Sequence, residues 1–378
     1  MTTFAGSLPP RVLQGDLGAG GGPRNAPLSL KDGVAARWPL DDVLQTRLLV
    51  LDTGSGRVSH THIPALPALL RAGDLLVLND AATLPASLPA TVQGGAGQGI
   101  EVRLAGPADT RFQAWNAVLF GPGDWRTPTE RRPAPPGLSP GDVLRFGDAL
   151  TATITGVSAI SPRLVRIVFD PDGAALWAAL YALGRPVQYS YLAGPLAPWH
   201  VQTAWAARPW AMEMPSAGHP LPWRLLEAVR QRGVGLATLT HAAGLSSTGD
   251  AALDAALPLP EIYELPTATV TALDETRRRG GRIVAVGTSV VRALEDNVRR
   301  GDGVLEAGRF QTGLRLGPAD RNLIVDALLT GMHEPDTSHY DLMGAFAPPE
   351  LLARGVEEAI AAGYRWHEFG DATLIVGG

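Results

Sequence analysis

Residues 282–295 constrain the fold more than any other stretch, because an apolar run there meets a Gly-Thr-Ser turn and then a helical pattern. Residues 282–286 predict a strand rich in β-branched side chains, and Gly287 permits a tight turn. Thr288 or Ser289 is then expected to cap a helix whose first N–H groups lack internal partners. This pattern predicts an α/β protein. The helix start can bind an anion, although the same unit also occurs as plain structure in α/β folds.

The rest of the 378-residue chain predicts two domains and a flexible lead-in. Residues 1–30 are rich in glycine and show little periodicity, so we expect a flexible N-terminal segment. Short strand candidates between Gly- and Pro-rich turns predict an antiparallel β-barrel domain over residues 86–170. Longer helical patterns alternate with strands over residues 31–85 and 171–378, which together predict a discontinuous, partial-barrel-like α/β catalytic domain.

The composition excludes several classes of function. The chain has no cysteine, which rules out disulfides, thiolate catalysis and cysteine-bound metals. No apolar run approaches the roughly 20 residues that span a bilayer, and no signal-peptide pattern is present, so we expect a cytoplasmic protein without membrane contact. The formal charge of −5 argues against a broad basic surface, although arginine clusters such as residues 277–279 could touch phosphates. The oligomeric state does not follow from the sequence.

The densest cluster of chemically active side chains lies in residues 333–341. His333, Asp336, His339 and Asp341 could transfer protons in a substrate site, bind a divalent cation, or lie in a solvated loop. The two histidines are six residues apart and a proline follows the first, which is not a metal-site spacing. We therefore predict these four residues as catalytic and expect no metal.

Other candidate residues lie in turns that follow predicted strands, where α/β proteins usually bind ligands. A His in such a turn is also compatible with a purely structural role, and Asn-Asp pairs also cap turns. The predicted substrate-binding residues are Asn79, Asp80, Pro215, Ser216, Ala217, Gly218, His219, His241, Gly287, Thr288, Ser289 and Arg292. We expect Asn79 and Asp80 to contact ribose, the small residues to allow close backbone approach, and Arg292 to bind a carboxylate or a helix end.

Several of these segments occur in a collinear order over nearly the whole chain. The stretches are residues 47–52, 73–80, 85–86, 202–203, 215–218, 280–282, 287–288, 292, 295, 333, 335, 345–346 and 370–371. In this order they resemble the S-adenosylmethionine:tRNA ribosyltransferase-isomerase family of queuosine biosynthesis. The resemblance implies an α/β domain with an inserted β-barrel. It also implies that S-adenosylmethionine is the co-substrate, and that its ribosyl group is transferred and isomerised onto a 7-aminomethyl-7-deazaguanine base of tRNA, giving epoxyqueuosine.

The chain departs from that family at some positions of the site. His219 and His241 are each displaced by one position, Asp336 stands where the family has Lys, and residues 257–262 lack the family's paired His. Three alternatives therefore stay open: a related enzyme with a non-tRNA acceptor, a nucleoside-binding protein without turnover, and a metal-assisted hydrolase that uses the four residues predicted as catalytic. S-adenosylmethionine is the expected partner. If the chain catalyses the reaction of the family, tRNA is the expected acceptor.

Overall fold

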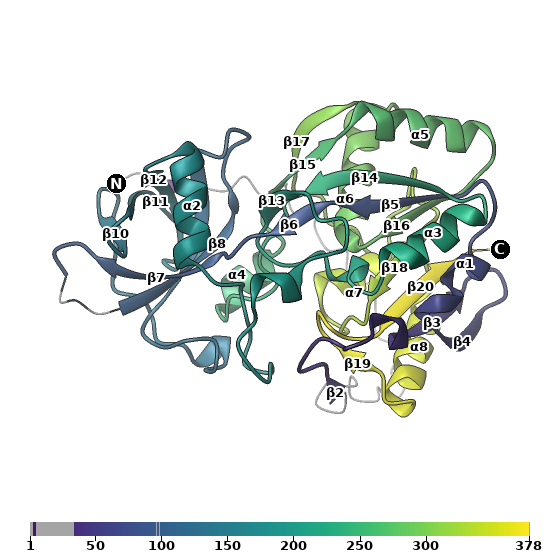
Figure 1. Cartoon of the computed structure of the whole chain (residues 1–378), viewed down its shortest axis with the longest axis horizontal. Helices are drawn as coiled ribbons and strands as arrows, with labels where there is room; N and C mark the ends of the chain where they lie inside the picture. The colour runs from purple at the N-terminus through teal and green to yellow at the C-terminus, as the bar shows by residue number, and fades with distance from the viewer. Residues whose placement is uncertain (1–2, 5–33, 96, 98, 378) are drawn as a thin grey trace, which may run out of the picture.

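The computed structural model describes residues 3–4, 34–95, 97 and 99–377, which form two lobes (Figure 1). One lobe is built on a closed antiparallel barrel and the other on a nine-stranded mixed sheet. The expected fold class, an α/β domain with an inserted antiparallel β-barrel, is therefore confirmed. The expected flexible segment, residues 1–30, lies outside the described residues except for Thr3 and Phe4. These two form β1 (Thr3–Phe4), which pairs with a barrel strand.

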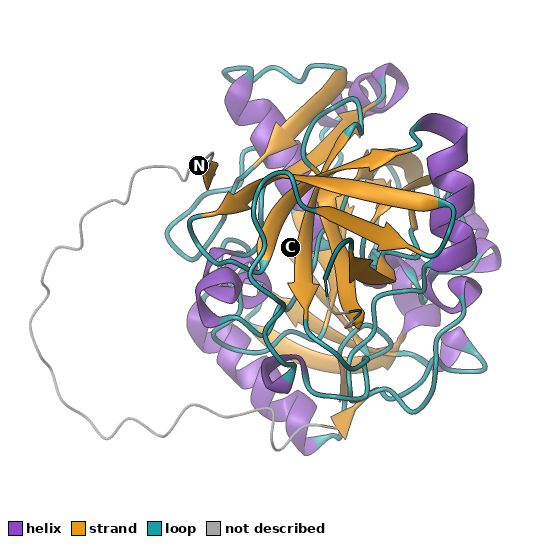
Figure 2. Cartoon of the chain, turned by 90° about the vertical axis from the view of Figure 1, so that its left-hand side faces the viewer, coloured by secondary structure: helices purple, strands orange, loops and turns teal. Residues whose placement is uncertain are grey.

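Six strands close the barrel because the last one pairs back to β11. In spatial order they are β11 (Leu150–Ser158), β10 (Val143–Phe146), β7 (Ser87–Val92), β8 (Gly99–Pro107), β9 (Ala114–Phe120) and β12 (Leu164–Asp170). Along β11 every second side chain is buried, as expected for a strand with one face in a core. Helix α2 (Gly173–Leu183) packs its Leu176 and Leu180 into the same core. Figure 2 looks onto this lobe.

The second lobe contains the nine-stranded sheet. Its strands, in spatial order, are β17 (Gly308–Thr312), β15 (Glu261–Leu265), β14 (Gly235–His241), β5 (Leu75–Asn79), β16 (Ile283–Val286), β18 (Ala327–Gly331), β20 (Ala372–Val376), β3 (Arg47–Asp52) and β4 (Arg57–His62). The four strands β14, β5, β16 and β18 are mutually parallel. All residues of β5 and β16 are buried, because helices cover both faces of the sheet.

Alternate residues of β5 enter two different cores. Leu75 and Val77 pack with α5 (Thr267–Arg278), α6 (Thr288–Arg300) and α8 (Pro349–Ala361) on one face. Leu76 and Leu78 pack with α1 (Leu66–Leu69) and α3 (Trp223–Gln231) on the other. The apolar run therefore folds as a central strand between two layers of helices.

Shorter elements complete the described chain. They are β2 (Val34–Ala35) paired with β19 (Arg365–Trp366), β6 (Ala81–Thr83) paired with β13 (Arg208–Ala211), α4 (Ala251–Ala256), α7 (Ser338–Met343), and the 3₁₀ turns η2 (Val43–Gln45), η3 (Ile63–Ala65), η4 (Thr129–Arg131), η5 (Pro198–Val201) and η6 (Ser216–Gly218). In Figure 1, β6, β13 and α4 lie between the two lobes. No helix in the described part of the chain is long and apolar enough to cross a membrane.

The chain enters and leaves the barrel lobe at one place. Ser87, at the start of β7, and Arg185, just after α2, exchange two backbone hydrogen bonds of 2.9 Å. The bounds predicted for the inserted domain, residues 86–170, remain a prediction. We propose that α2 belongs to the same inserted unit, because its apolar face packs in the barrel core.

The expected cap of α6 is wrong. Gly287 is the residue before the helix, with φ of 94°, and no side chain accepts a hydrogen bond from the first turn. Thr288 already belongs to the helix, so neither its hydroxyl nor that of Ser289 is in a capping position. The first N–H groups of α6 are therefore left without a side-chain cap.

Candidate active site

The carboxyl ends of four parallel strands lie along one edge of the large sheet. β14 ends at His241, β5 at Asn79, β16 at Val286 and β18 at Gly331. The antiparallel β20 begins at the same edge, since Ala372 pairs with Gly331. The turns that follow these strands, together with the residues before β20, come from distant parts of the chain and meet here.

The turn at Gly287 lies against η6. The Gly287 N–H donates to the carbonyl of Leu329 at 2.8 Å, and a Cβ at this glycine would lie 3.5 Å from the Cβ of Ala217. At Gly218 a Cβ would lie 2.7 Å from the indole of Trp205, so only glycine fits. The structure therefore brings Ser216, Ala217 and Gly218 beside the start of α6.

Asn79 and Asp80 have different surroundings. The amide of Asn79 is buried and bonded to the protein on both sides: its oxygen accepts from the His241 and Ala81 N–H groups at 2.9 and 3.0 Å. Its nitrogen donates to the His241 carbonyl at 3.0 Å. This amide joins β5 to β14 and leaves no free group for a ribose. Asp80 is half-buried and accepts from the Thr240 hydroxyl at 2.5 Å, so its carboxylate remains the candidate for ribose.

His333 and His339, predicted as catalytic, lie face to face. Their ring centres are 5.0 Å apart and the planes differ by 12°. The His333 Nε2 is 2.6 Å from the Thr330 hydroxyl at the end of β18. Burial, and then the neighbouring His339, lower the pKa of His333 well below its usual value, and burial and Arg292 lower the pKa of His339. Both imidazoles are thus neutral at pH 7.

The two carboxylates predicted as catalytic do not join that pair. Asp336 is exposed in the turn before α7 and has φ of 68°. Asp341 is exposed on α7 itself. The short helix α7, capped by the Thr337 hydroxyl, carries His339 toward the sheet and leaves Asp341 at the surface.

His241 belongs to a second buried cluster. Its Nε2 lies 3.5 Å from Glu261, too far for a hydrogen bond, and burial lowers its pKa to about 4. The Glu261 carboxylate accepts from the Gly244 N–H at 2.6 Å and pairs with Arg292. Burial would raise the pKa of Glu261, but Arg292 and His241 outweigh burial, so the pKa lies below its usual value. Glu261 was not predicted as a site residue from the sequence, because its contacts with Arg292 and His241 depend on tertiary packing.

A pocket of about 80 Å³ opens beside this cluster. It is lined by Pro258, Thr288, Arg292, Leu314, Arg315, Leu316, Ser338, His339, Asp341 and Leu342. Four of these, Thr288, Arg292, His339 and Asp341, are residues predicted from the sequence. Arg315 was missed, because an arginine in an irregular segment carries no periodic signal.

A third cluster is formed by two tyrosines, Tyr189 and Tyr191, together with residues that precede η6 and β20. Tyr189 donates a hydrogen bond to Glu213, and Tyr191 donates one to Glu368. The Tyr191 ring stacks on His367 with ring centres 4.2 Å apart. Burial raises the pKa of Glu368 to about 7 and also raises the pKa of Glu213. His219, another predicted residue, lies near this cluster with its ring 5.5 Å from that of Phe369.

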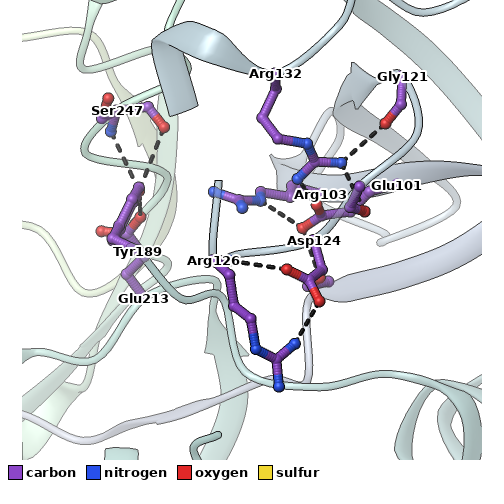
Figure 3. A network of polar contacts seen from close by, with 11 residues as sticks. Glu101, Arg103, Gly121, Asp124, Arg126, Arg132, Tyr189, Glu213 and Ser247 are labelled. Atoms are coloured by element: carbon purple, nitrogen blue, oxygen red, sulfur yellow. Dashed lines mark hydrogen bonds and ion pairs between the residues drawn. The ribbon is translucent and has the colours of Figure 1, made fainter. Parts of the chain in front are cut away.

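Barrel residues reach this third cluster. Figure 3 shows Arg103 extending from β8 toward Tyr189, and the guanidinium lies 5.5 Å from the centre of the Tyr189 ring. Glu101 holds Arg103 in place by accepting from its Nε at 2.6 Å, and the same carboxylate pairs with Arg132. The aromatic cluster therefore contacts both lobes. The sequence does not predict that these residues meet, because they come from four separate segments.

Among the described residues, no three or more His, Asp or Glu side chains are grouped closely enough to hold a metal ion. His333 and His339, the two histidines considered for a metal site, stack on each other.

Comparison with known proteins gives a consistent result. A sequence model of the family described as queuosine biosynthesis protein matches residues 28–375. The S-adenosylmethionine:tRNA ribosyltransferase-isomerase of Gloeobacter violaceus is 33% identical over 355 residues, covering 93% of this chain and 94% of that protein. The enzyme of the same name from Methylobacterium radiotolerans is 36% identical over 340 residues, covering 88% and 91%.

Among solved structures, a crystal structure of S-adenosylmethionine tRNA ribosyltransferase from Thermotoga maritima is similar to this chain. It is 26% identical, with a TM-score of 0.49, and the match covers 91% of this chain and 96% of that one.

Proposed function

Since the chain belongs to the queuosine biosynthesis protein family, a family of transferase-isomerase enzymes, we propose that it transfers and isomerises the ribosyl group of S-adenosylmethionine onto a 7-aminomethyl-7-deazaguanine base of tRNA. Its relatives are named S-adenosylmethionine:tRNA ribosyltransferase-isomerase, and the similarity extends over nearly their whole length. S-adenosylmethionine is thus the proposed co-substrate and tRNA the proposed acceptor.

One observation of the structure carries this proposal. The stacked pair His333 and His339 lies at the carboxyl edge of the parallel strands, next to a pocket whose wall includes the uncapped start of α6. A cofactor-free rearrangement of a ribosyl group needs groups that move protons, and it needs a fixed position for the donor. The paired imidazoles can move protons, and the pocket beside them can hold part of the donor in a fixed position.

The proposed roles follow from the surroundings of each residue. His333 and His339 are neutral, so each ring keeps one N–H and one unprotonated nitrogen, and we assign proton transfer to them. Asp80 is assigned to a ribose hydroxyl, since its carboxylate is partly accessible at the end of β5. The small residues at positions 215–218 and Gly287 let the two turns pack closely at the edge of the site. Asp336, at the surface, is proposed to contact the acceptor side.

A second acceptor class is favoured by one specific observation. The exposed carboxylate of Asp336 follows His333 closely in the sequence, so it adds negative charge near the site that would repel a phosphate backbone. A small acceptor without phosphates would avoid this repulsion. The proposed reaction on S-adenosylmethionine would then be the same, with a different acceptor.

The test is incubation of the purified protein with S-adenosylmethionine, with and without tRNA that carries the deazaguanine precursor. Mass spectrometry then measures adenine, methionine and modified tRNA. Formation of all three supports the proposal, and adenine release only with a small acceptor supports the second candidate. If no product forms and calorimetry detects no binding of the donor, both proposals are refuted. Binding without product would indicate a nucleoside-binding protein instead.

A further inference from the structure

We propose that the pocket between α6 and α7 is a subsite for a zwitterionic α-amino acid group, with Arg292 and Arg315 facing the carboxylate and Asp341 facing the ammonium group. In the proposed function this group is the methionine end of the donor, so the identity of the bound molecule rests on that function. The subsite itself rests on the charges and contacts of the pocket.

Arg292 provides the first argument. This side chain is only 7% exposed, and its Nε and Nη1 are engaged by the Leu314 carbonyl at 2.9 Å and by Glu261. Its third nitrogen, Nη2, is buried and has no hydrogen-bond partner among the described residues. Arg292 also lines the pocket. A buried guanidinium nitrogen without a partner is costly, and a carboxylate oxygen in the pocket would satisfy it.

The start of α6 adds a second donor set on the same wall. Thr288 lines the pocket and lies in the first turn of this 13-residue helix. No side chain caps the turn, so its N–H groups and the helix dipole favour a negative group there. The volume of about 80 Å³ has room for a small polar group.

The balance of charge indicates a zwitterion rather than a plain anion. Arg315 also lines the pocket, and burial together with Arg292 lowers the pKa of its guanidinium. The two guanidiniums are balanced by Glu261, which pairs with Arg292, and by Asp341 at the mouth, while His339 is neutral. A phosphate would bring uncompensated charge to such a pocket. An amino acid brings one charge of each sign, and side chains of both signs line the pocket.

The experiment uses the full chain and the free amino acid L-methionine, so that no turnover is required. Equilibrium dialysis would compare L-methionine with methioninol, which lacks the carboxylate, and with N-acetyl-L-methionine, which lacks the ammonium group. Each lost charge is expected to weaken binding by about tenfold or more. Equal binding of the three compounds, or no binding of L-methionine at about 10 mM, would overturn the proposal.

Variants assign the two ends of the ligand. Asp341→Asn is expected to remove the discrimination against N-acetyl-L-methionine and to keep that against methioninol. Arg315→Met is expected to remove the discrimination against methioninol and to keep that against N-acetyl-L-methionine. Both residues are exposed, so both proteins should fold. Asp148→Asn, on an exposed hairpin of the barrel, makes the same charge change as a control and should bind all three compounds like the parent protein. Unchanged discrimination in Asp341→Asn would refute the assignment.

Two further outcomes are distinct from failure of the proposed function. Competition by inorganic phosphate as strong as that by L-methionine would indicate a plain anion site and overturn the zwitterion. Selective binding of L-methionine without adenine release from S-adenosylmethionine would keep the subsite and refute the proposed reaction. Adenine release by a protein that binds methioninol and L-methionine equally would support the proposed reaction and refute the subsite.

Discussion

At the scale of single residues, His241 shows how burial controls protonation. Its side chain is fully buried and neither ring nitrogen has a hydrogen-bond partner among the described residues. Burial lowers its pKa from 6.5 to about 4 in the folded chain. The unfolded chain therefore binds the proton more tightly than the folded chain, and the stability due to this group is complete above pH 6.5 and lost as the pH falls toward 4.

We expect His241→Gln to flatten this pH dependence. From pH 7 to pH 5 the parent protein should lose about 2 kcal/mol of unfolding free energy through this one group. The variant should lose that much less over the same interval, whatever its absolute stability. Urea unfolding at both pH values measures the difference. His62→Gln, at an exposed site on β4, is the control. An equal loss in His241→Gln and the parent protein would contradict the assignment.

The imidazole of His333 belongs to the same scale. His333→Gln keeps a polar side chain beside the Thr330 hydroxyl and removes the proton acceptor. We expect kcat for adenine release to fall by about 10²-fold or more, with the Kd for S-adenosylmethionine within about threefold of the parent value. Rapid-quench assays and calorimetry measure the two quantities. A large rise in Kd with unchanged kcat would mean that His333 binds the donor and does not move a proton.

At the scale of elements, a buried carboxylate of α6 anchors this helix to the segment before β18. In the sequence it stands out only as one of the positions that carry the resemblance to the family. Glu295 is fully buried and accepts the N–H groups of Leu323, Ile324 and Val325 at 2.9 to 3.1 Å. It also pairs with Arg299 one turn later. This contact fixes α6, which carries Arg292, to the segment that leads into β18 and His333.

Replacing this buried carboxylate should therefore lower the unfolding free energy far more than replacing an exposed carboxylate that also pairs with an arginine four residues later. Glu295→Gln leaves a buried acceptor set incomplete, and we expect a loss of about 3 kcal/mol in unfolding free energy. Glu275→Gln on α5 breaks an exposed pair with Arg279, also four residues apart, and should cost less than about 0.5 kcal/mol. Chemical denaturation of both variants checks this. Equal effects would show that the buried contacts of Glu295 contribute little.

The sequence predicts some elements better than others, for physical reasons. The strand and helix of residues 282–300 were recognised because the apolar run, Gly287 and the helical period agree locally. β15 and β17 were missed, since their mixed polarity reflects pairing with distant strands. The stacking of His333 on His339 and the uncapped Gly287 turn depend on tertiary packing, which periodicity does not report. The place of Arg315 in the pocket and the contacts around Glu213 depend on tertiary packing in the same way.

At the scale of the whole molecule, Arg309 ties the two lobes together. This residue of β17 donates a hydrogen bond of 2.6 Å to the carbonyl of Thr110, in the barrel turn after β8. Its guanidinium pairs with Glu264 and lies 4.7 Å from the centre of the Trp210 ring. The position of the barrel relative to the large sheet thus depends partly on one arginine.

Arg309→Met should loosen the barrel turn without unfolding either lobe. We expect amide hydrogen exchange in residues 108–113 to accelerate by about fivefold, which corresponds to about 1 kcal/mol, because the side chain is partly exposed. Arg111→Met, in the same exposed turn, removes a guanidinium that has no role in this contact and is the control. Mass spectrometry of exchanged peptides measures both. Similar rates in the two variants would argue against the contact.

The paired backbones of Ser87 and Arg185 have a consequence for how such a chain can change over time. The two points at which the barrel is attached are joined by hydrogen bonds. The distance between the ends that the rest of the chain must connect therefore does not depend on the size of the inserted domain. A replacement module of another size would need only two neighbouring ends. This junction is therefore the natural place for evolution or protein engineering to exchange the barrel for a different module while the large sheet is retained.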